Sequence, residues 1–533
     1  MLPIIENYKS WNEFTFRKSK VWYTGEIKAS FLKKLIKNFD FKQSNLKNFK
    51  KEISKLSERF AVIIWFHKNL SVAFVDKIKS FPVFVCKMKN GYKFSNNALS
   101  LEKIMPGKDK NPSSILSIRM SGYSIGRDTI YENLKQLMPG EICIIDKNRL
   151  KFISYYSFFK KAPFYKGTNA FLSKKLSNIT LEVFKELINK NKDRKIVIPL
   201  SGGYDSRLIV SVLYHLNAKN IICYSYGKKN NFEAKVAKSI AHELGYPWYF
   251  IELNNTSQRI NFNSDIYKKY TKYSDTLSSW SYVQDFFAVN KLLSKKFIPC
   301  DAVIVNGNTG DFITGGHLPK LIKVENKKRR IDKIFEYIML KHFSLWENFF
   351  TEKDYKIIKK KVLKTFPSSL NGVRKEEEHR IYEYVEFINR QCNYVVQGQR
   401  VYDFFNLKWE LPLWHDKYLD FWNRVPYEKK YKQKLYKFML KNNNWADVWT
   451  KYPINKHYIS PPSIGLLREM LKLFFLFRKN SWSNFDKKYI SYFTELVPHY
   501  SYFRYYNIIK EKRIARSSVA WHVESYLKTK NLI

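Results

Sequence analysis

One strand-to-helix junction constrains the fold of this chain more than any other feature. The apolar run KIVIPL, residues 195–200, is typical of a buried parallel strand; the loop SGGYDS follows it, and a helix-like segment continues over 207–216. The alternation recurs downstream. Strand-like runs follow at 220–227, 248–253 and 302–307, and a helical pattern lies between the first two at 232–244. Strands that alternate with helices predict a doubly wound parallel α/β sheet, which binds ligands at the carboxyl ends of its strands.

The loop after the first of these strands has the residues of an anion-binding site. Gly202 and Gly203 let the backbone approach a ligand and adopt positive φ, so that amides at the start of the next helix point at an anion. Ser201 and Ser206 add hydroxyl donors. Asp205 would repel phosphate on its own, and it makes sense if it holds Mg²⁺ that bridges to phosphate oxygens. The alternative is an ordinary strand–turn–helix with a polar cap; the spacing of a Walker A loop is absent.

A second glycine-rich loop follows the strand-like run at 302–307. Its sequence, NGNTGDFITGGH over 306–317, contains Gly307 and a single aspartate, Asp311. Carboxylates at the ends of two nearby strands can share a Mg²⁺ that binds a polyphosphate, so the two loops together predict a nucleotide site. His317 closes the loop, and it either faces a substrate or packs as a structural residue.

The chain on either side of this region has a different pattern. The first 160 residues are rich in strand patterns, with a predicted hairpin at 59–65 and 70–76. Further strands are expected at 81–87, 92–98 and 138–146, and a helix at 171–190. From about residue 331 onward the pattern is mainly helical.

Lysine dominates the composition. The net charge of +48 would attract nucleic acid, an anionic membrane face or acidic substrates, although lysine is spread as evenly as a compositional bias would spread it. The five cysteines stand far apart without CxxC pairs, so neither a disulfide framework nor a zinc site is expected. The chain has no secretory signal pattern and no apolar run of about 18 residues, which favours a cytoplasmic location.

One C-terminal segment combines apolar and basic residues. Residues 466–479 read LLREMLKLFFLFRK. We expect a helix buried against the core; the alternative is a helix that lies on the inner face of an anionic membrane and makes the protein peripheral to it. Lipid-linked sugar substrates would suit that alternative.

The two loops resemble motifs of the asparagine synthetase-like family of ATP pyrophosphatases. In that family SGGxDS cradles the pyrophosphate of ATP, and a later SGxGxDExxGG segment carries a second aspartate that binds Mg²⁺; residues 201–206 and 306–316 look like these segments. The strand ICYSYG lies where the family binds adenine through backbone groups. The resemblance implies that Asp205 and Asp311 hold Mg²⁺. It implies ATP contacts for Ser201, Gly202, Gly203, Asp205, Ser206, Tyr226, Gly227 and Gly307.

Residues 409–440 resemble a further part of the family pattern, E-x-R-x-P-F-L-D followed by G-x-K-x-x-L-R. By that match Lys434 would stabilise charge on an acyl-adenylate and pyrophosphate. Glu410 would be the acid/base carboxylate.

The N-terminal part resembles the family's glutaminase domain in the stretches 59–85 and 129–146. The resemblance implies a sandwich of the N-terminal nucleophile (Ntn) hydrolase type over 1–165, followed over 170–533 by the ATP-pyrophosphatase domain with a helical C-terminal part. Leu2 stands where the family has its nucleophilic cysteine, so we expect no glutaminase activity.

Other positions also depart from the family pattern. Lys77 and Lys79 replace the arginine and glycine of a D-R-x-G segment, and Phe312 replaces a glutamate of the second loop. Asn308 departs from the same loop. Arg207 stands where asparagine-forming members usually have serine, so aspartate is not implied as the substrate. The Arg207 guanidinium is expected to reach a phosphate or an acidic substrate, or to form a salt bridge on a helix face.

The resemblance implies ATP-dependent amide formation on a small carboxylate through an acyl-adenylate. The nitrogen would come from ammonia, from a separate glutaminase or from an amino group of the substrate, as in β-lactam synthetases and lasso-peptide cyclases. Amidation of a uronic acid during surface-polysaccharide synthesis is another reading. tRNA-modifying ATP pyrophosphatases share SGGxDS but lack a glutaminase-like half, so tight nucleic-acid binding is not expected. A nucleotide-binding scaffold without catalysis is the remaining alternative.

Overall fold

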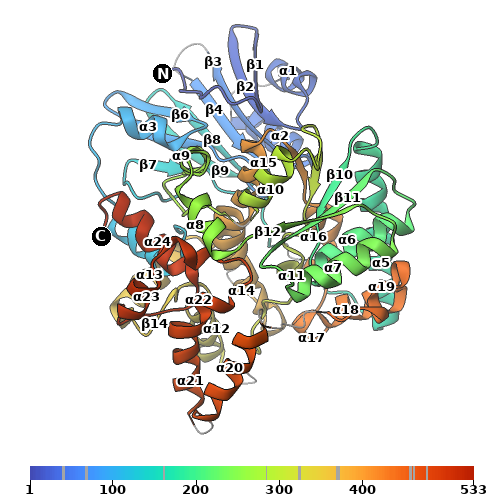
Figure 1. Ribbon diagram of the computed structural model, residues 1–533. Coiled ribbons are helices and arrows are strands. Elements are labelled where there is room, and N and C mark those ends of the chain that lie inside the picture. Colours follow the sequence, from blue (N-terminus) through green and yellow to red (C-terminus); the bar gives the residue numbers. More distant parts are fainter. Residues whose placement is uncertain are drawn as a thin grey trace.

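The computed structural model contains an antiparallel β-sandwich, a parallel sheet flanked by helices, and a helical C-terminal part (Figure 1). It describes the whole chain except residues 39–42, 67–69, 160–161, 284, 322–325, 368–371, 455–458, 460–461 and 476–477. Within the described residues, none of the helices has both the length and the hydrophobicity that a membrane span requires.

Two antiparallel sheets form the sandwich, with strand orders β1-β2-β3-β4-β8-β9 and β6-β5-β7. Their bounds are β1 Trp11–Phe16, β2 Ser19–Gly25, β3 Phe60–Phe66, β4 Leu70–Val75, β5 Phe84–Met88, β6 Gly91–Ser95, β7 Leu134–Gln136, β8 Glu141–Asp146 and β9 Arg149–Ser154. Alternate residues of β3 face opposite sides. Ala61 and Ile63 join the core of the smaller sheet, whereas Val62 and Ile64 pack with the helices on the outer face. Because both faces are covered, β3 is an unbroken apolar run.

Two helices, α1 Ala29–Asn38 and α2 Gln43–Ser54, pack on the outer face of the larger sheet. Helix α3 Ala98–Ile104 contacts the strands of the smaller sheet, and α4 Pro112–Ser121 packs against helices of the C-terminal part. Asn97 and Asn111 cap α3 and α4 by accepting hydrogen bonds from the amides of Ser100 and Ser114.

The parallel sheet has the order β12-β11-β10-β13-β15. Its strands are β10 Ile196–Pro199, β11 Ile221–Gly227, β12 Trp248–Glu252, β13 Val303–Val305 and β15 Lys408–Glu410. The chain builds outward from β10 first toward β12 and then, in the other direction, toward β15. The strand order therefore reverses between β10 and β13, and in a doubly wound sheet this is where a ligand crevice opens.

Helices flank the parallel sheet and form the C-terminal part. Those around the sheet are α5 Asn169–Lys190, α6 Tyr204–His215, α7 Phe232–Glu243, α8 Asn255–Asn263, α9 Asp265–Ser274, α10 Phe286–Ser294 and α11 Gly310–Ile313. The longer helices that follow are α12 Lys327–His342, α13 Glu352–Lys364, α14 His379–Val385, α15 Arg400–Phe404, α16 Asp416–Asn423, α18 Lys434–Asn443, α20 Pro462–Leu473, α21 Lys479–Phe485, α23 Tyr505–Lys510 and α24 Ser518–Thr529. A π-helical stretch, Glu386–Val395, extends α14, and the short strands β14 Trp346–Glu347 and β16 Ile514–Ala515 pair in this part.

The main sequence predictions of fold are confirmed. The strand after residue 195 and the three later ones are β10 to β13, and the runs at 59–65 and 70–76 pair as β3 and β4. The turn predicted between β3 and β4 lies mostly outside the described residues. The strands β1, β2, β7, β9, β14, β15 and β16 were not predicted. β1, β2 and β9 carry many polar or charged residues, and the other four have only two or three residues each.

The expectation that residues 466–479 are buried against the core is wrong. Helix α20, which contains most of this segment, has no buried residue. It projects with α21 from the lower end of the molecule as drawn in Figure 1.

A buried lysine connects the sandwich to the helical part. Lys79 is fully buried, and its ammonium donates hydrogen bonds to Oε1 of Gln136 (2.8 Å) and to Oδ1 of Asn393 in the π-helical stretch. Its backbone has φ +55°, the left-handed region that glycine favours, which accounts for the glycine expected here from the resemblance. Burial lowers the pKa of Lys79 to about 7, so the neutral amine is favoured.

Replacing this lysine should change how stability depends on pH. Since the pKa of Lys79 is about 7 when folded and near 10.5 when unfolded, the unfolded chain binds more protons between these values, and this group makes stability rise with pH. In the wild type this group would raise the free energy of unfolding by up to about 1.4 kcal/mol per pH unit between about pH 7 and pH 9, and we expect Lys79→Met to abolish that increase. The measurement is urea unfolding at a series of pH values. Lys87→Met, at an exposed position of β5, is the matched control. An unchanged pH slope in Lys79→Met would contradict this role.

Candidate nucleotide site

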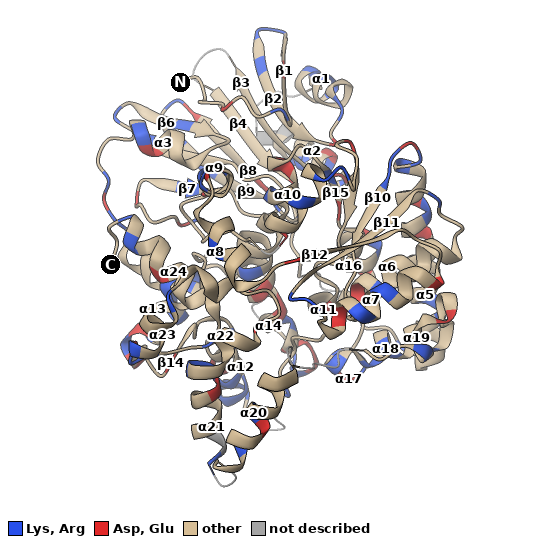
Figure 2. Cartoon of the chain, viewed as in Figure 1, with Lys and Arg blue, Asp and Glu red and all other residues tan. Residues whose placement is uncertain are grey.

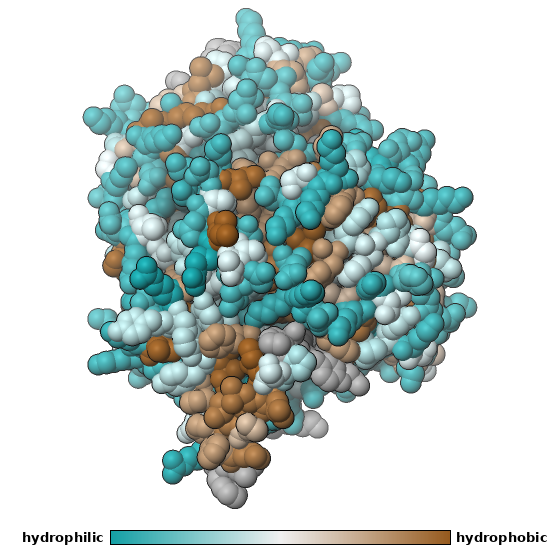
Figure 3. Space-filling view, viewed as in Figure 1, coloured by the Kyte–Doolittle hydropathy of each residue, from teal (hydrophilic) through white to brown (hydrophobic). Residues whose placement is uncertain are grey.

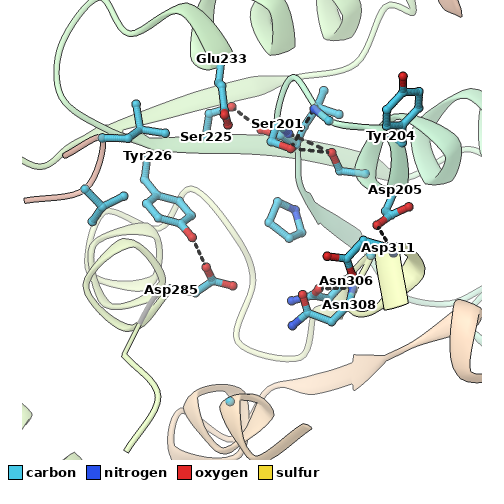
Figure 4. A pocket seen from close by; sticks show the side chains of 18 of the residues that line it. Ser201, Tyr204, Asp205, Ser225, Tyr226, Glu233, Asp285, Asn306, Asn308 and Asp311 are labelled. Atoms are coloured by element: carbon cyan, nitrogen blue, oxygen red, sulfur yellow. Dashed lines mark hydrogen bonds between the residues drawn. The ribbon is translucent and has the colours of Figure 1, made fainter. Parts of the chain in front are cut away.

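A cavity of about 370 Å³ opens at the carboxyl ends of β10, β11 and β13, where the strand order reverses (Figure 4). Asp205 and Asp311 lie together at one end of it, and Tyr226 and Asp285 lie at the other. Its lining includes Ser201, Gly203, Tyr204, Asp205, Ser206, Ser225, Tyr226, Asn231, Glu233, Tyr282, Asp285, Asn306, Gly307, Asn308, Asp311, Gly398, Gln399, Tyr402, Gln433, Leu496 and Val497.

The loop 201–206 is organised by its two serines. Oγ of Ser206 accepts a hydrogen bond from the Ser201 amide (3.0 Å) and lies 3.1 Å from Oγ of Ser201, which in turn accepts from the Gly203 amide (3.2 Å). Helix α6 begins at the next residue, and Gly203, its N-cap, supplies no side chain. The first amides of α6 therefore remain available to an anion at the cavity.

The predicted positive φ of the two loop glycines is wrong. Gly203 has φ −82°, and Gly202 is not among the positive-φ residues. The conformational demand falls instead on the second loop. A Cβ at Gly310 would lie 2.3 Å from Oδ1 of Asp205, and one at Gly307 would lie 2.9 Å from its Cβ. These two glycines let the second loop close onto Asp205.

Asp205 joins the two loops. Its Oδ2 accepts a hydrogen bond from the backbone amide of Asp311 (3.0 Å), and its Oδ1 accepts one from the Tyr436 hydroxyl on α18 (3.0 Å). Burial and the nearby charge of Asp311 raise the pKa of Asp205 to about 7. A positive charge bound beside this carboxylate would favour its ionised form and lower its pKa again.

Asp311 belongs to a chain of alternating charges. His317 Nε2 lies 2.8 Å from Oδ2 of Asp311, and His317 Nδ1 lies 2.5 Å from Oε1 of Glu386. Arg390 continues the chain at 3.2 Å from the same Glu386 oxygen. Burial disfavours the imidazolium, but the two carboxylates outweigh it and raise the pKa of His317 to about 9. His317 is therefore a cation that orients Asp311, the structural alternative that the sequence left open.

A buried carboxylate orders the far end of the cavity. Asp285 accepts hydrogen bonds from the hydroxyls of Tyr226 and Tyr402, the latter at 2.5 Å, and Tyr402 accepts one from Nδ2 of Asn306 (3.1 Å). Burial raises the pKa of Asp285. The network holds the Tyr226 ring in place beside the strand end that the sequence assigned to adenine.

Gly227 acts at this end through its lack of a side chain. It has φ +124°, and a Cβ there would lie 2.9 Å from the carbonyl oxygen of Leu496. The Lys228 amide donates to the same oxygen (3.0 Å), so residues 496–497 pack over the end of β11 and close this side of the cavity. Gly227 itself is not part of the lining.

The cavity is acidic. Its described lining contains four carboxylates, of Asp205, Glu233, Asp285 and Asp311, and no lysine, arginine or histidine. A polyphosphate could not approach Asp205 and Asp311 without a cation. Their hard oxygen donors fit Mg²⁺, which commonly binds one or two protein carboxylates together with phosphate oxygens and water. Among the described residues, no group of three or more His, Cys, Asp and Glu side chains is arranged to hold a metal ion.

The structure does not bring Lys434 and Glu410 to this cavity. Lys434 is the exposed first residue of α18, and its neighbour Gln433 lines the cavity instead. Glu410, in β15, pairs with Arg59 (2.9 Å) and Lys190 (2.6 Å). It lines a separate cavity of about 430 Å³ between the sandwich and the sheet. Their catalytic roles stay predictions from the resemblance.

Several cavity residues were missed by the sequence analysis. Asp285, Tyr402 and Leu496 line the cavity, and no local motif surrounds them. Tyr436 acts at the cavity through its hydrogen bond to Asp205. Tyr436 lies two residues after Lys434, on the buried face of α18 with Leu435, Met439 and Leu440. The apolar spacing of that helix is the sequence signal that points to this face.

Comparison with known protein families agrees with this geometry. The family model described as asparagine synthase matches residues 188–443. Residues 188–443 belong to the asparagine synthase family. This asparagine synthase domain has the fold of the ATP pyrophosphatases with a pyrophosphate-binding loop, and it includes both glycine-rich loops, Asp285, Glu410 and Lys434. The sandwich and residues 444–533 lie outside the match, and no curated protein matches the chain.

Arg207 ties the synthase domain's first loop to a later segment. It is fully buried, and its guanidinium donates to the carbonyl oxygens of Gly202 (3.2 Å), Val448 (3.1 Å), Tyr452 (2.9 Å) and Pro453 (2.7 Å). Burial without a carboxylate partner lowers its pKa to about 10. The two roles expected from sequence, an anion contact and a surface salt bridge, are both wrong: Arg207 holds backbone.

Removing this guanidinium should unfold or loosen the loop. We expect Arg207→Ser to destabilise the protein by about 3–5 kcal/mol, since it leaves several buried carbonyls without donors. The measurement is urea unfolding, with Arg329→Ser at an exposed position of α12 as the control. A loss of less than about 1 kcal/mol would show that the carbonyls find other donors.

The His317 pairing should contribute to stability in a pH-dependent way. Because the pKa of His317 is raised to about 9 from 6.5, its contribution is complete below pH 6.5 and is lost as the pH rises through about 9. In buffer without divalent cations we expect His317→Gln to cost about 1–3 kcal/mol near neutral pH and much less near pH 10. His215→Gln, an exposed histidine at the end of α6, should show no such trend. A cost that is constant with pH would refute the pairing.

Proposed function

We propose that the chain is an ATP-dependent carbon–nitrogen ligase that activates a carboxylate as an acyl-adenylate and releases pyrophosphate. The observation that carries the proposal is the contact between Asp205 and the Asp311 backbone, which joins both glycine-rich loops at one end of a single cavity. The asparagine synthase domain supports ATP-dependent ligation in general. The AMP-forming course and the substrate belong to the proposal.

The residues of the cavity have distinct parts in this reaction. The loop amides and the hydroxyls of Ser201 and Ser206 would bind the β- and γ-phosphates, and Tyr226, held by Asp285, would flank the adenine. Mg²⁺ bound by Asp205 and Asp311 would supply positive charge at the phosphates. The carboxylate oxygen of the substrate attacks the α-phosphorus and pyrophosphate leaves. An amine then attacks the acyl carbon, loses a proton, and AMP leaves with the bonding electron pair.

The nitrogen donor in the proposal is ammonia or an amine rather than glutamine hydrolysed by the sandwich. Both cysteines of the sandwich, Cys86 and Cys143, are buried within it. Burial raises the pKa of the Cys86 thiol to about 11 and that of Cys143 well above its usual range, so neither is a nucleophile near neutral pH. A separate glutaminase that supplies ammonia is compatible with this arrangement.

The proposed acid is a small polar carboxylate. Side-chain amides of Asn308, Gln399 and Gln433 line the cavity and can bond both donors and acceptors, which suits a hydroxylated acid such as a uronic acid. A substrate that carries its own amine and cyclises is the second candidate, since it needs no external nitrogen.

The net charge of +48 favours one further candidate, a tRNA-modifying ATP pyrophosphatase. The N-terminal sandwich speaks against it, because the resemblance gives that enzyme class no such half. Low-nanomolar retention of tRNA in filter binding at physiological salt would reverse this ranking.

The proposal is tested by pyrophosphate release from ATP with a panel of uronic acids, amino acids and amino-substituted acids, each with and without ammonium. We expect AMP and pyrophosphate with at least one acid, and a loss of about 100-fold or more in Asp205→Asn. Asp265→Asn, at a carboxylate 86% exposed on α9, is the matched control. Release of ADP and phosphate, or full activity in Asp205→Asn, would overturn the proposal; ATP binding without any turnover would favour a scaffold.

Two further variants test the roles implied by the resemblance. Lys434→Ala should lower the rate of pyrophosphate release, and Glu410→Gln should do so only if Glu410 leaves its pairs with Arg59 and Lys190 during the reaction. Wild-type rates in both variants would remove the two residues from the mechanism.

A further inference from the structure

The hairpin of α20 and α21 exposes an apolar row that nothing in the described chain covers. The row, named here the apolar edge, comprises Leu466 (67% exposed), Leu467 (50%), Met470 (51%), Leu473 (62%) and Phe474 (83%). Their spacing places them on one side of α20 and its end. Figure 3 shows a hydrophobic patch over this projection, on a face that is otherwise largely hydrophilic. Contiguous exposed patches of this kind mark interaction sites.

The opposite side of the hairpin is well packed, so the apolar edge is presented by a formed structure. Phe475 packs against Trp482 and Phe485, with ring centroids 5.6 and 5.2 Å apart. Arg468 grips both oxygens of Asp486, at 2.7 and 3.1 Å, and lies over the Trp482 ring. The side chains of the edge therefore face outward because the inner side is already filled.

Positive charge surrounds the edge. Residues 462–488 contain six lysines and arginines against two acidic residues. Lys472 and Arg478 are exposed at the end of α20 and just beyond it, and Figure 2 marks basic positions at the tip of the hairpin. Both acidic residues of the segment, Glu469 and Asp486, are engaged by Arg468. Glu469 also lies 3.5 Å from Lys472, so what flanks the apolar edge is an excess of basic over acidic residues. An apolar row with such an excess matches the boundary between anionic head groups and acyl chains.

We propose that the apolar edge docks this protein on an anionic lipid surface. Helix α20 has 12 residues and is about 18 Å long, so it would lie in the plane of the interface rather than cross it. Leu473 and Phe474 would enter the acyl boundary while Lys472 and Arg478 meet lipid phosphates. A second copy of the chain is a poorer occupant, because both partners would bring a net charge of +48 to the contact.

The docking surface is connected to the nucleotide cavity. The chain leaves α21 at Phe485 and reaches Leu496 and Val497 in the cavity wall. Between them, the carbonyl oxygen of Phe493 accepts a hydrogen bond from Lys228, directly after β11. Docking would thus hold one wall of the cavity near the lipid surface.

The test is sedimentation of the full chain with vesicles of phosphatidylcholine that contain zero or about 30% phosphatidylglycerol. We expect binding to the anionic vesicles that weakens with added salt and with loss of the anionic lipid. The double variant Leu473→Ser/Phe474→Ser should bind at least about tenfold more weakly, because two acyl-inserting side chains are lost. The matched control is Ile260→Ser/Phe171→Ser, which removes side chains 67% and 58% exposed on α8 and α5 and should bind within about twofold of wild type.

Other outcomes would overturn the proposal. These are no sedimentation of the wild type with anionic vesicles, equal binding of the edge variant and the control, or binding that ignores the anionic lipid. A dimer in light scattering that the edge variant abolishes would assign the edge to a second copy instead. If the double variant unfolds at a lower temperature than the control, the single change Phe474→Ser, at the most exposed position, replaces it. The binding readout needs no catalysis, so it stands apart from the ligase proposal.

Discussion

The contact between one carboxylate and one backbone amide determines the geometry of the nucleotide site. Asp205 follows β10, and Asp311 follows the neighbouring strand β13; only because these strands pair in parallel do their loops reach each other. The close approach requires glycine at 307 and 310, since any side chain at 310 would overlap the Asp205 carboxylate. Two acidic groups are thereby forced together, and the structure compensates one of them with the imidazolium of His317. The charge of Asp205 is balanced in part by its hydrogen bonds from the Asp311 amide and the Tyr436 hydroxyl, and a bound cation would complete the balance.

Buried basic side chains hold this chain together where packing alone would not fix its segments. Arg207 binds four carbonyl oxygens from two segments that are far apart in sequence, and Lys79 connects the sandwich to the π-helical stretch. Neither has a carboxylate partner in these contacts, and burial lowers the pKa of both. Such groups specify one arrangement of the segments more than they add net stability, because the cost of burying them offsets much of the free energy of their hydrogen bonds. They fix where the first loop and the domain interface lie.

Local patterns predicted the parts of the fold that are decided locally. The strands β10 to β13, the two glycine-rich loops and the pair Asp205–Asp311 follow from short apolar runs and from the rule that parallel strands end on one edge. Sequence could not predict Asp285 or Tyr402, which reach the cavity through helix packing. It also could not place Lys434, because Lys432 and Gln433 adopt left-handed backbone (φ +57° and +60°) just before α18, and Gln433 rather than Lys434 lines the cavity after this turn. The burial predicted for 466–479 failed because an apolar face shows only that something covers it, not that the same chain does.

The distribution of charge links the site to the surface. A chain with a net charge of +48 has gathered four carboxylates into its nucleotide cavity, without a basic side chain in the described lining. The outer field attracts polyanions over roughly a Debye length, about 8 Å at physiological salt, whereas the cavity repels them at contact. An anion that the positive outer surface attracts can enter the acidic cavity only together with a cation. Under the proposed function, the same arrangement would admit a metal–nucleotide complex and would disfavour free phosphates and nucleic-acid backbones, which arrive with loosely held counterions. The selectivity of the cavity would therefore rest on the acidity of Asp205 and Asp311 as much as on the amides of the first loop.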